Sequence, residues 1–281
     1  MGAQAPGATA AVDAPKGDAM VERVVRRDRI AVGAGVVVVA SLAWAHLLGM
    51  GGHTAPMGGG MGTSMARSMA MPHPQAWGGA DLALLVIMWA VMMVAMMLPS
   101  AAPLVLLFAT ISRRRRERRS PAAPTTALAA GYLLAWAAFA VAAGIAQWAL
   151  HRAALLSPAT STAGPTLGGL LLVAAGLYQW TPLKGRCLSE CRSPLGFLTR
   201  EWREGTRGAL VMGARHGAFC VGCCWVLMAL LFVAGVMNML WIAALTIYVL
   251  VEKVAPAGGW FARVAGLLLV AWGGWVLAAS S

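Results

Sequence analysis

Long apolar runs, separated by short polar and basic segments, dominate this chain. Residues 1–20 are rich in Ala, Gly and Pro without periodicity, but the apolar runs further along approach or exceed the roughly 20 residues that a helix needs to cross a bilayer. The pattern predicts an all-α, polytopic transmembrane helix bundle with about seven spans. The expected spans are residues 30–50, 82–109, 127–150, 167–181, 209–236, 238–254 and 260–279.

Charged residues are rare, and most of the basic ones lie between the runs. Only 11% of the 281 residues are charged, against about a quarter in soluble domains, which excludes a soluble enzyme. Lys and Arg gather before the first run, at 113–119 and between Lys184 and Arg207, so the positive-inside rule places the N-terminus in the cytoplasm. We expect a multi-pass protein of the bacterial inner membrane. Its net charge of +12 suits contact with the lipid bilayer; nucleic acid is not an expected partner, because no recognition fold has room here.

The first apolar run has a second interpretation. Three arginines precede it, and Ala43-Trp44-Ala45 resembles the cleavage site of a signal peptide, whose removal would leave six spans. The run continues to near-spanning length, which favours a span. The predicted organisation is a flexible basic tail (1–29), a first span or signal anchor (30–50), an outer loop (51–80) and a metal-binding helix bundle (81–281).

The outer loop and the second span are both rich in methionine. Thioether and imidazole groups suit copper, so we expect weak metal capture in the loop; the alternative is a flexible linker. In the second span, methionines four residues apart share a helix face, and Pro99 and Pro103 are expected to break or kink the helix. This face predicts a metal path, although methionine also fills cores adaptably. The candidate capture residues are His53, Met57, Met61, Met65, Met69 and His73, and the path residues are Met88, Met92 and Met96, with Met212 and Met228 on the fifth span.

Cysteine spacing is the most specific signal in the chain. All five cysteines fall between positions 187 and 224, and the first two lie in a basic loop expected to be cytoplasmic, where thiols stay reduced. In the fifth span, Met212, His216, Cys220, Cys224 and Met228 form a row at four-residue spacing. Two adjacent sites or a path fit this row better than a closed cage. The predicted metal ligands are Cys187, Cys191, His216, Cys220, Cys223 and Cys224.

The identity of the metal follows from the surplus of methionine. A tetrahedral zinc site built from cysteines is the alternative, but methionine has little affinity for zinc and suits Cu(I). We therefore expect a copper ion, with Cu(I) favoured and zinc as the alternative. Arg215 either stabilises nearby thiolates or anchors the span at the membrane interface, and Glu252-Lys253 is interpreted as a plain ion pair.

The chain resembles a bacterial family of predicted metal-binding integral membrane proteins, long treated as a domain of unknown function. The resemblance covers about residues 82–279. It implies a multi-span helical protein with a metal near the five cysteines, and relatives imply copper delivery to copper-containing oxidases. The segments that carry it are WAVMMVAMMLPS, LYQWTPLKGRCLSECRSPLGF, HGAFCVGCCWVLM and FVAGVMN.

These observations favour a copper-handling membrane protein, for transfer, uptake or delivery, with a copper chaperone or a copper-containing oxidase as its partner. The chain holds no phosphate-binding, dinucleotide-binding or triad motif, which excludes an ATP-driven pump, and an enzyme is the less favoured class. Two alternatives stay open. One is a membrane thiol redox protein that cycles Cys220–Cys223 with Cys187–Cys191, and the other is a structural zinc or assembly subunit.

Overall fold

The computed structural model describes residues 32–49, 79–117, 123–157, 161–255 and 258–280. Over these residues the protein is all-α, as the sequence predicts. In chain order the elements are the helix Val32–Gly49, α3 (Gly79–Glu117), α4 (Thr125–Arg152), α5 (Pro165–Tyr178), α6 (Pro182–Arg192), α7 (Pro194–Glu201), α8 (Gly205–Ala229), α9 (Leu231–Ala234), α10 (Met239–Val254) and α11 (Gly258–Ser280).

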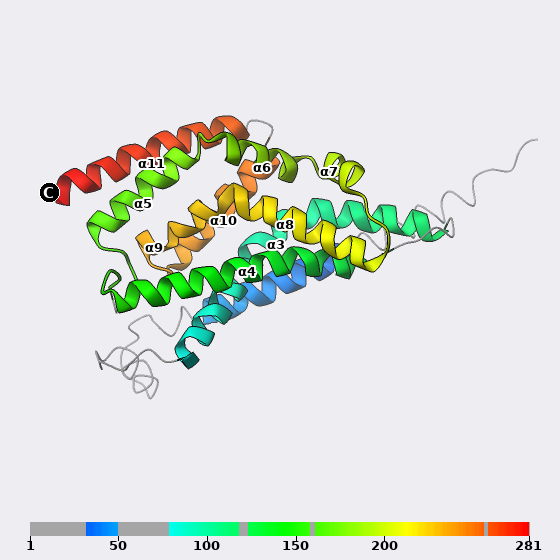
Figure 1. The fold of residues 1–281 in the computed structure, drawn as a ribbon, viewed down its shortest axis with the longest axis horizontal. Coiled ribbons are helices and arrows are strands. Elements are labelled where there is room, and N and C mark those ends of the chain that lie inside the picture. The colour runs from blue at the N-terminus through cyan, green and yellow to red at the C-terminus, as the bar shows by residue number, and fades with distance from the viewer. Residues whose placement is uncertain (1–31, 50–78, 118–122, 158–160, 256–257, 281) are drawn as a thin grey trace, which may run out of the picture.

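Five helical segments in the described part are long and apolar enough to cross a membrane. They are the helix Val32–Gly49, α3, α4, α8 continued by α9, and α11. From α3 onward the long helices alternate in direction, so the basic segment at the end of α3 and helices α6 and α7 lie toward the same end (Figure 1). The structure supports a membrane protein; the count of seven spans and the side that each end faces stay predictions.

Two of the predicted spans are short helices. Helix α5 has 14 residues and α10 has 16, about 21 and 24 Å at 1.5 Å per residue, against a hydrocarbon core of about 30 Å. The predicted loop between α5 and α8 is also helical, because α6 and α7 fill most of it. Pro182 and Pro194 begin these two helices at a position where proline is favoured.

Helix α3 continues through both prolines, so neither of them breaks it, and the expected kink stays a prediction. Pro99 has no N–H to donate to the carbonyl of Ala95, four residues earlier. The indole of Trp44 donates to that carbonyl instead, at 3.2 Å, and so supplies the missing partner from the helix Val32–Gly49. The sequence argument that proline frees a backbone group in need of a partner is confirmed, and the partner is a neighbouring helix.

Helices α4 and α8 approach each other at backbone distance. A Cβ atom on Gly213 would lie 1.9 Å from the Leu128 carbonyl oxygen, and one on Gly131 would lie 2.0 Å from the Leu210 oxygen. Small residues allow such contact between membrane helices, where packing rather than the hydrophobic effect drives association. Tyr132 follows Leu128 by one turn, so this contact sets the position of its ring against α8.

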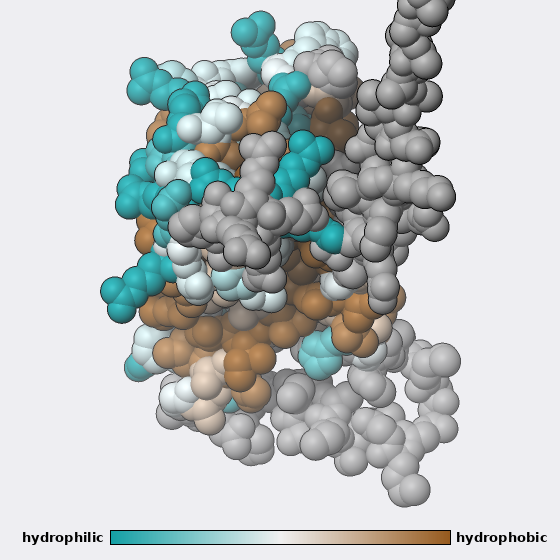
Figure 2. Space-filling model, turned by 90° about the vertical axis from the view of Figure 1, so that its right-hand side faces the viewer, coloured by the Kyte–Doolittle hydropathy of each residue, from teal (hydrophilic) through white to brown (hydrophobic). Residues whose placement is uncertain are grey.

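The end view in Figure 2 shows how polarity is distributed over this part of the surface. Hydrophilic side chains gather over one region, beside a hydrophobic region. Exposed ion pairs join this end of the bundle: Arg115 of α3 contacts Glu204 at 3.0 Å, and Arg215 of α8 contacts Glu201 of α7 at 2.5 Å. Arg215 therefore serves as a surface anchor and is not the partner of a thiolate.

The α4–α8 contact generates a stability prediction. We expect Gly213→Ala to lower the free energy of unfolding in detergent by about 1–3 kcal/mol, because the new methyl group forces the helices apart. Thermal unfolding of the purified protein measures this. Gly274→Ala is the matched control, since a Cβ there meets nothing within 4 Å. Equal stability of the two variants would contradict the close packing.

Candidate metal centre

The five cysteines gather where α6 packs against α8. Cys220, Cys223 and Cys224 are fully buried on α8, Cys187 is buried on α6, and Cys191 is half-buried one turn later. A Cβ on Gly222 of α8 would lie 2.8 Å from the Sγ of Cys187, so the two helices meet through this sulfur. All five thiols are free. The structure thus brings together the two cysteine groups that lie about thirty residues apart in the sequence.

Cys220 lies at the centre of the thiol site, which we define as the five cysteines and His216. The Nζ atom of Lys253 lies 2.9 Å from its Sγ, and the hydroxyl of Tyr132 lies 3.1 Å from the same sulfur. The thiols of Cys223 and Cys224 donate to the Cys220 carbonyl at 3.1 and 3.0 Å. Cys220 therefore has an ammonium group as its partner, whereas its two neighbours use their protons in hydrogen bonds to the backbone.

The pKa values of the two thiols on α6 are raised by their surroundings. Burial, followed by the charges of Cys223 and Glu190, raises the pKa of the Cys187 thiol. Hydrogen bonds with Cys220 and Cys223, together with burial, hold the pKa of the Cys191 thiol well above its ordinary value. Both thiols therefore keep their protons near neutral pH, because burial and the neighbouring groups disfavour the charged thiolate.

His216 is buried four residues before Cys220 and packs between two aromatic rings. Its ring centroid lies 5.0 Å from that of Phe197 on α7 and 6.1 Å from that of Tyr132 on α4. Its Nδ1 atom is buried and has no hydrogen-bond partner among the described residues. A buried imidazole nitrogen without a partner is unusual, and a metal ion would satisfy it.

Two buried lysines hold the site in place, and the interpretation of Glu252-Lys253 as a plain pair is wrong. Glu252 contacts Lys184 of α6 at 2.7 Å, with both side chains 1% exposed. Lys253 contacts Cys220 of α8 and also donates to the Ser100 hydroxyl of α3 at 2.9 Å. Neighbouring helix residues point in directions about 100° apart, so these two charges reach different elements.

The methionine face lies inside the bundle. Met92 and Met96 are fully buried and Met88 is half-buried. The carbonyl of Met97 accepts a hydrogen bond from Tyr132 at 3.0 Å, which connects this stretch of α3 to the ring that contacts Cys220. On α8, Met228 is buried, whereas the Met212 sulfur accepts the backbone N–H of Arg203 at 3.3 Å. Met212 is thus already engaged in a local contact.

Several predicted ligands are not placed by the structure. The outer-loop candidates, from His53 to His73, lie outside the described residues. Within the described part, no three His, Cys, Asp or Glu side chains are arranged around a common point as ligands of one ion. The convergence of His216, Cys220 and Cys223 therefore stays a prediction. What the structure does show is their burial, and that Cys220 and its thiol neighbours share hydrogen bonds.

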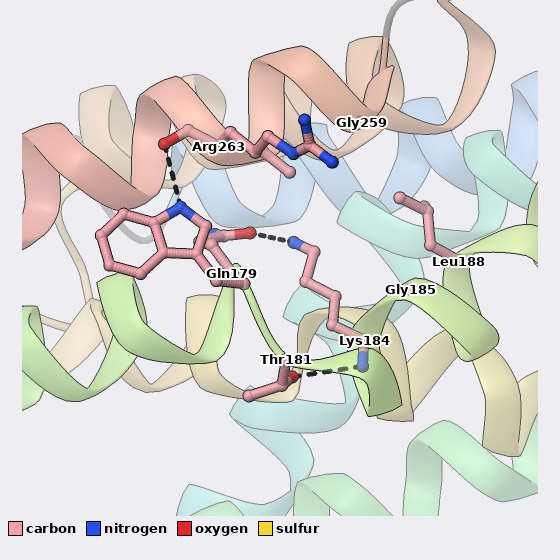
Figure 3. A pocket seen from close by; sticks show the side chains of 9 residues that line it. Gln179, Thr181, Lys184, Gly185, Leu188, Gly259 and Arg263 are labelled. Atoms are coloured by element: carbon pink, nitrogen blue, oxygen red, sulfur yellow. Dashed lines mark hydrogen bonds between the residues drawn. The ribbon is translucent and has the colours of Figure 1, made fainter.

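A pocket of about 440 Å³ lies beside α6. Residues at the junction of α5 and α6 and at the start of α11 line it, and none of the five cysteines does. Figure 3 shows how the junction is fixed: the Lys184 amine donates to the side-chain oxygen of Gln179, and the Trp180 indole donates to the Arg263 carbonyl at 3.2 Å. These bonds hold the first turn of α6, and hence Lys184, in position.

The residues that sequence reasoning missed are those that contact Cys220 or hold its partner. They share one feature, which is that their role depends on contacts between distant helices. Only Glu252 and Lys253 carried a signal, since an ionisable side chain in an apolar helix marks a functional site by default. The missed residues are Ser100, Tyr132, Lys184, Glu252 and Lys253.

The residues of the thiol site fit copper. The site offers five reduced thiols and an imidazole nitrogen without a partner among the described residues, and α3 adds buried thioethers. These are soft donors, which bind Cu(I) better than they bind harder divalent ions. A hard cation such as Mg²⁺ would require oxygen ligands, and the sulfur-rich environment of Cys220 does not provide them.

Comparison with known proteins identifies the family. No curated protein matches the chain, and no solved structure does either. A family model described as PpoB2, copper chaperone, matches residues 86–276, which is more than half of the chain. The match covers α4 to α10 and most of α3 and α11, including all five cysteines and both buried lysines. It confirms the resemblance to a copper-delivery-like membrane family, and this protein belongs to the PpoB2 copper chaperone family.

Proposed function

We propose that this protein binds Cu(I) at the thiol site and passes it to a partner protein, acting as a membrane-bound copper chaperone. The observation that carries the proposal is the meeting of α6 and α8 through their cysteines around Cys220, in a chain of a copper chaperone family. Thiolates hold Cu(I) firmly, and exchange between thiolate sites allows an ion to pass from one protein to another.

The metal ligands in this proposal are the five cysteines, with His216 as a further donor. Lys253 would stabilise Cys220 as a thiolate before the metal binds. The neighbouring thiols of Cys223 and Cys224 would then lose their protons and become further ligands. Structural zinc sites normally have four ligands, whereas Cu(I) is stable with fewer soft donors. Copper is therefore the cargo that this site suits best.

The buried methionines of α3 provide the route to the thiol site. Met88, Met92 and Met96 run along one face, and their thioethers bind Cu(I) weakly enough for exchange. The route leads from the Met- and His-rich segment 51–80 on the outer side, where copper is captured or presented. The partner is then a second copper chaperone or a copper-containing oxidase, and the chain lies in the bacterial inner membrane with its N-terminus in the cytoplasm.

The first test is metal content. Protein purified anaerobically in detergent should hold copper by mass spectrometry, and a Cys220→Ser, Cys223→Ser, Cys224→Ser triple variant should lose most of it, because serine is a poor ligand for Cu(I). Ser189→Ala on α6 is the control, since this hydroxyl bonds only to the Arg186 carbonyl and leaves every thiol in place.

Other results would overturn the proposal. Zinc in the wild type that disappears in the triple variant would assign a structural zinc site. A metal-free protein whose thiols oxidise in pairs, with Cys220 joined to Cys223, would instead support the membrane thiol redox protein.

The second test concerns the methionine route. We expect Met92→Leu with Met96→Leu to lower copper transfer through the membrane severalfold in cells or vesicles, because leucine keeps the volume but removes the thioethers. The bound copper of the purified variant should stay at the wild-type level. Met239→Leu at the start of α10 is the matched control. Unchanged transfer in the double variant would show that these methionines only fill the core.

A further inference from the structure

Lys253 holds a position at the thiol site that the binding of copper alone does not explain. It lies near the C-terminal end of α10, is 7% exposed, and contacts the Sγ of Cys220 and the Oγ of Ser100, each at 2.9 Å. Within the part of the chain that the structure describes, no carboxylate lies within ion-pair distance of it. Its partners there are the sulfur of Cys220 and the hydroxyl of Ser100.

Two other pairs of charges near the site already neutralise each other. Lys184 and Glu252 neutralise one another at 2.7 Å, and Arg215 pairs with Glu201 at the surface. Cys223 and Cys224 donate their thiol protons to the Cys220 carbonyl, so they carry no charge in this state. Among these groups Lys253 is thus the charge that no carboxylate of the described residues neutralises, whereas a buried site is most stable when its charges balance.

The net charge of the site after metal binding depends on the charge of the ion. A monovalent soft cation bound by Cys220 and one further thiolate leaves the site neutral when Lys253 is counted. A divalent cation bound by the same two thiolates leaves one uncompensated positive charge, which is costly away from water, and reaches neutrality only if a third buried thiol also loses its proton. The ammonium therefore favours monovalent over divalent metal ions, whatever their common preference for sulfur.

We propose that Lys253 is a specificity-determining residue whose fixed positive charge makes the thiol site select a monovalent soft cation, Cu(I) or its analogue Ag(I), over zinc and cadmium. This inference rests on the proposed function and adds the reason for its selectivity. Lys253 acts through charge balance with the metal–thiolate unit and is not itself a ligand.

The experiment compares the affinities of the full-length, metal-free protein in detergent for Ag(I) and Cd(II), by competition with chelators of known affinity. In Lys253→Met we expect Ag(I) to bind about 10-fold more weakly and Cd(II) about 10-fold more tightly, so their affinity ratio falls about 100-fold. Lys253→Arg, which keeps the charge, should hold the ratio within about threefold of the wild type.

A second variant tests the effect of the charge while the Lys253 side chain stays in place. Ser100→Asp places a carboxylate against the ammonium and neutralises it, so the ratio should move in the same direction as in Lys253→Met. Thermal unfolding of each metal-free variant reports its folding separately from its selectivity.

The outcomes separate the two hypotheses. Equal changes in both affinities, or an unchanged ratio in Lys253→Met and Ser100→Asp, would overturn the role of Lys253 and leave the copper site standing. A wild-type protein that binds neither Ag(I) nor Cu(I) through its cysteines would overturn the proposed function itself.

Discussion

The geometry of the thiol site depends on one buried contact, between the Lys253 ammonium and the Cys220 sulfur. The ammonium is not stable alone in an apolar bundle, because an unpaired buried charge costs several kcal/mol. Glu252, the residue before Lys253, pairs with Lys184 and so attaches the same turn of α10 to α6. One turn of α10 thereby joins α3, α6 and α8, the three helices that carry the candidate metal ligands.

Close helix packing supplies the second constraint. The contact of Gly213 with the Leu128 carbonyl leaves no freedom in the separation of α4 and α8, and Tyr132 on α4 is then held 3.1 Å from Cys220. Its hydroxyl also bonds to the Met97 carbonyl, so a single side chain connects α3, α4 and α8. Close packing between small residues, which does not depend on water, thus fixes the position of Tyr132 at the thiol site.

The sequence predicts those parts of the fold and site that depend on periodicity and spacing. Apolar runs locate the long helices, and the four-residue row from His216 to Cys224 places these side chains along one helix. Helices α6 and α7 are not predicted from the sequence because they are short and carry polar residues, whereas hydropathy detects only long apolar segments. Lys253 was misassigned because adjacent opposite charges look like a pair in sequence, whereas on a helix they point about 100° apart and find separate partners.

The methionine stretch and the thiol site, which the sequence presents as separate features, meet at the first proline of α3. Because Pro99 has no N–H, the Ala95 carbonyl accepts a hydrogen bond from Trp44 instead. In the same turn, the Ser100 hydroxyl accepts from Lys253 and the Met97 carbonyl accepts from Tyr132. Both of these partners contact Cys220. A metal ion that changes the charge or position of Cys220 therefore acts on two groups that also bind α3 directly. The end of the methionine face is thus connected to Cys220 through the hydrogen bonds of Tyr132 and Lys253.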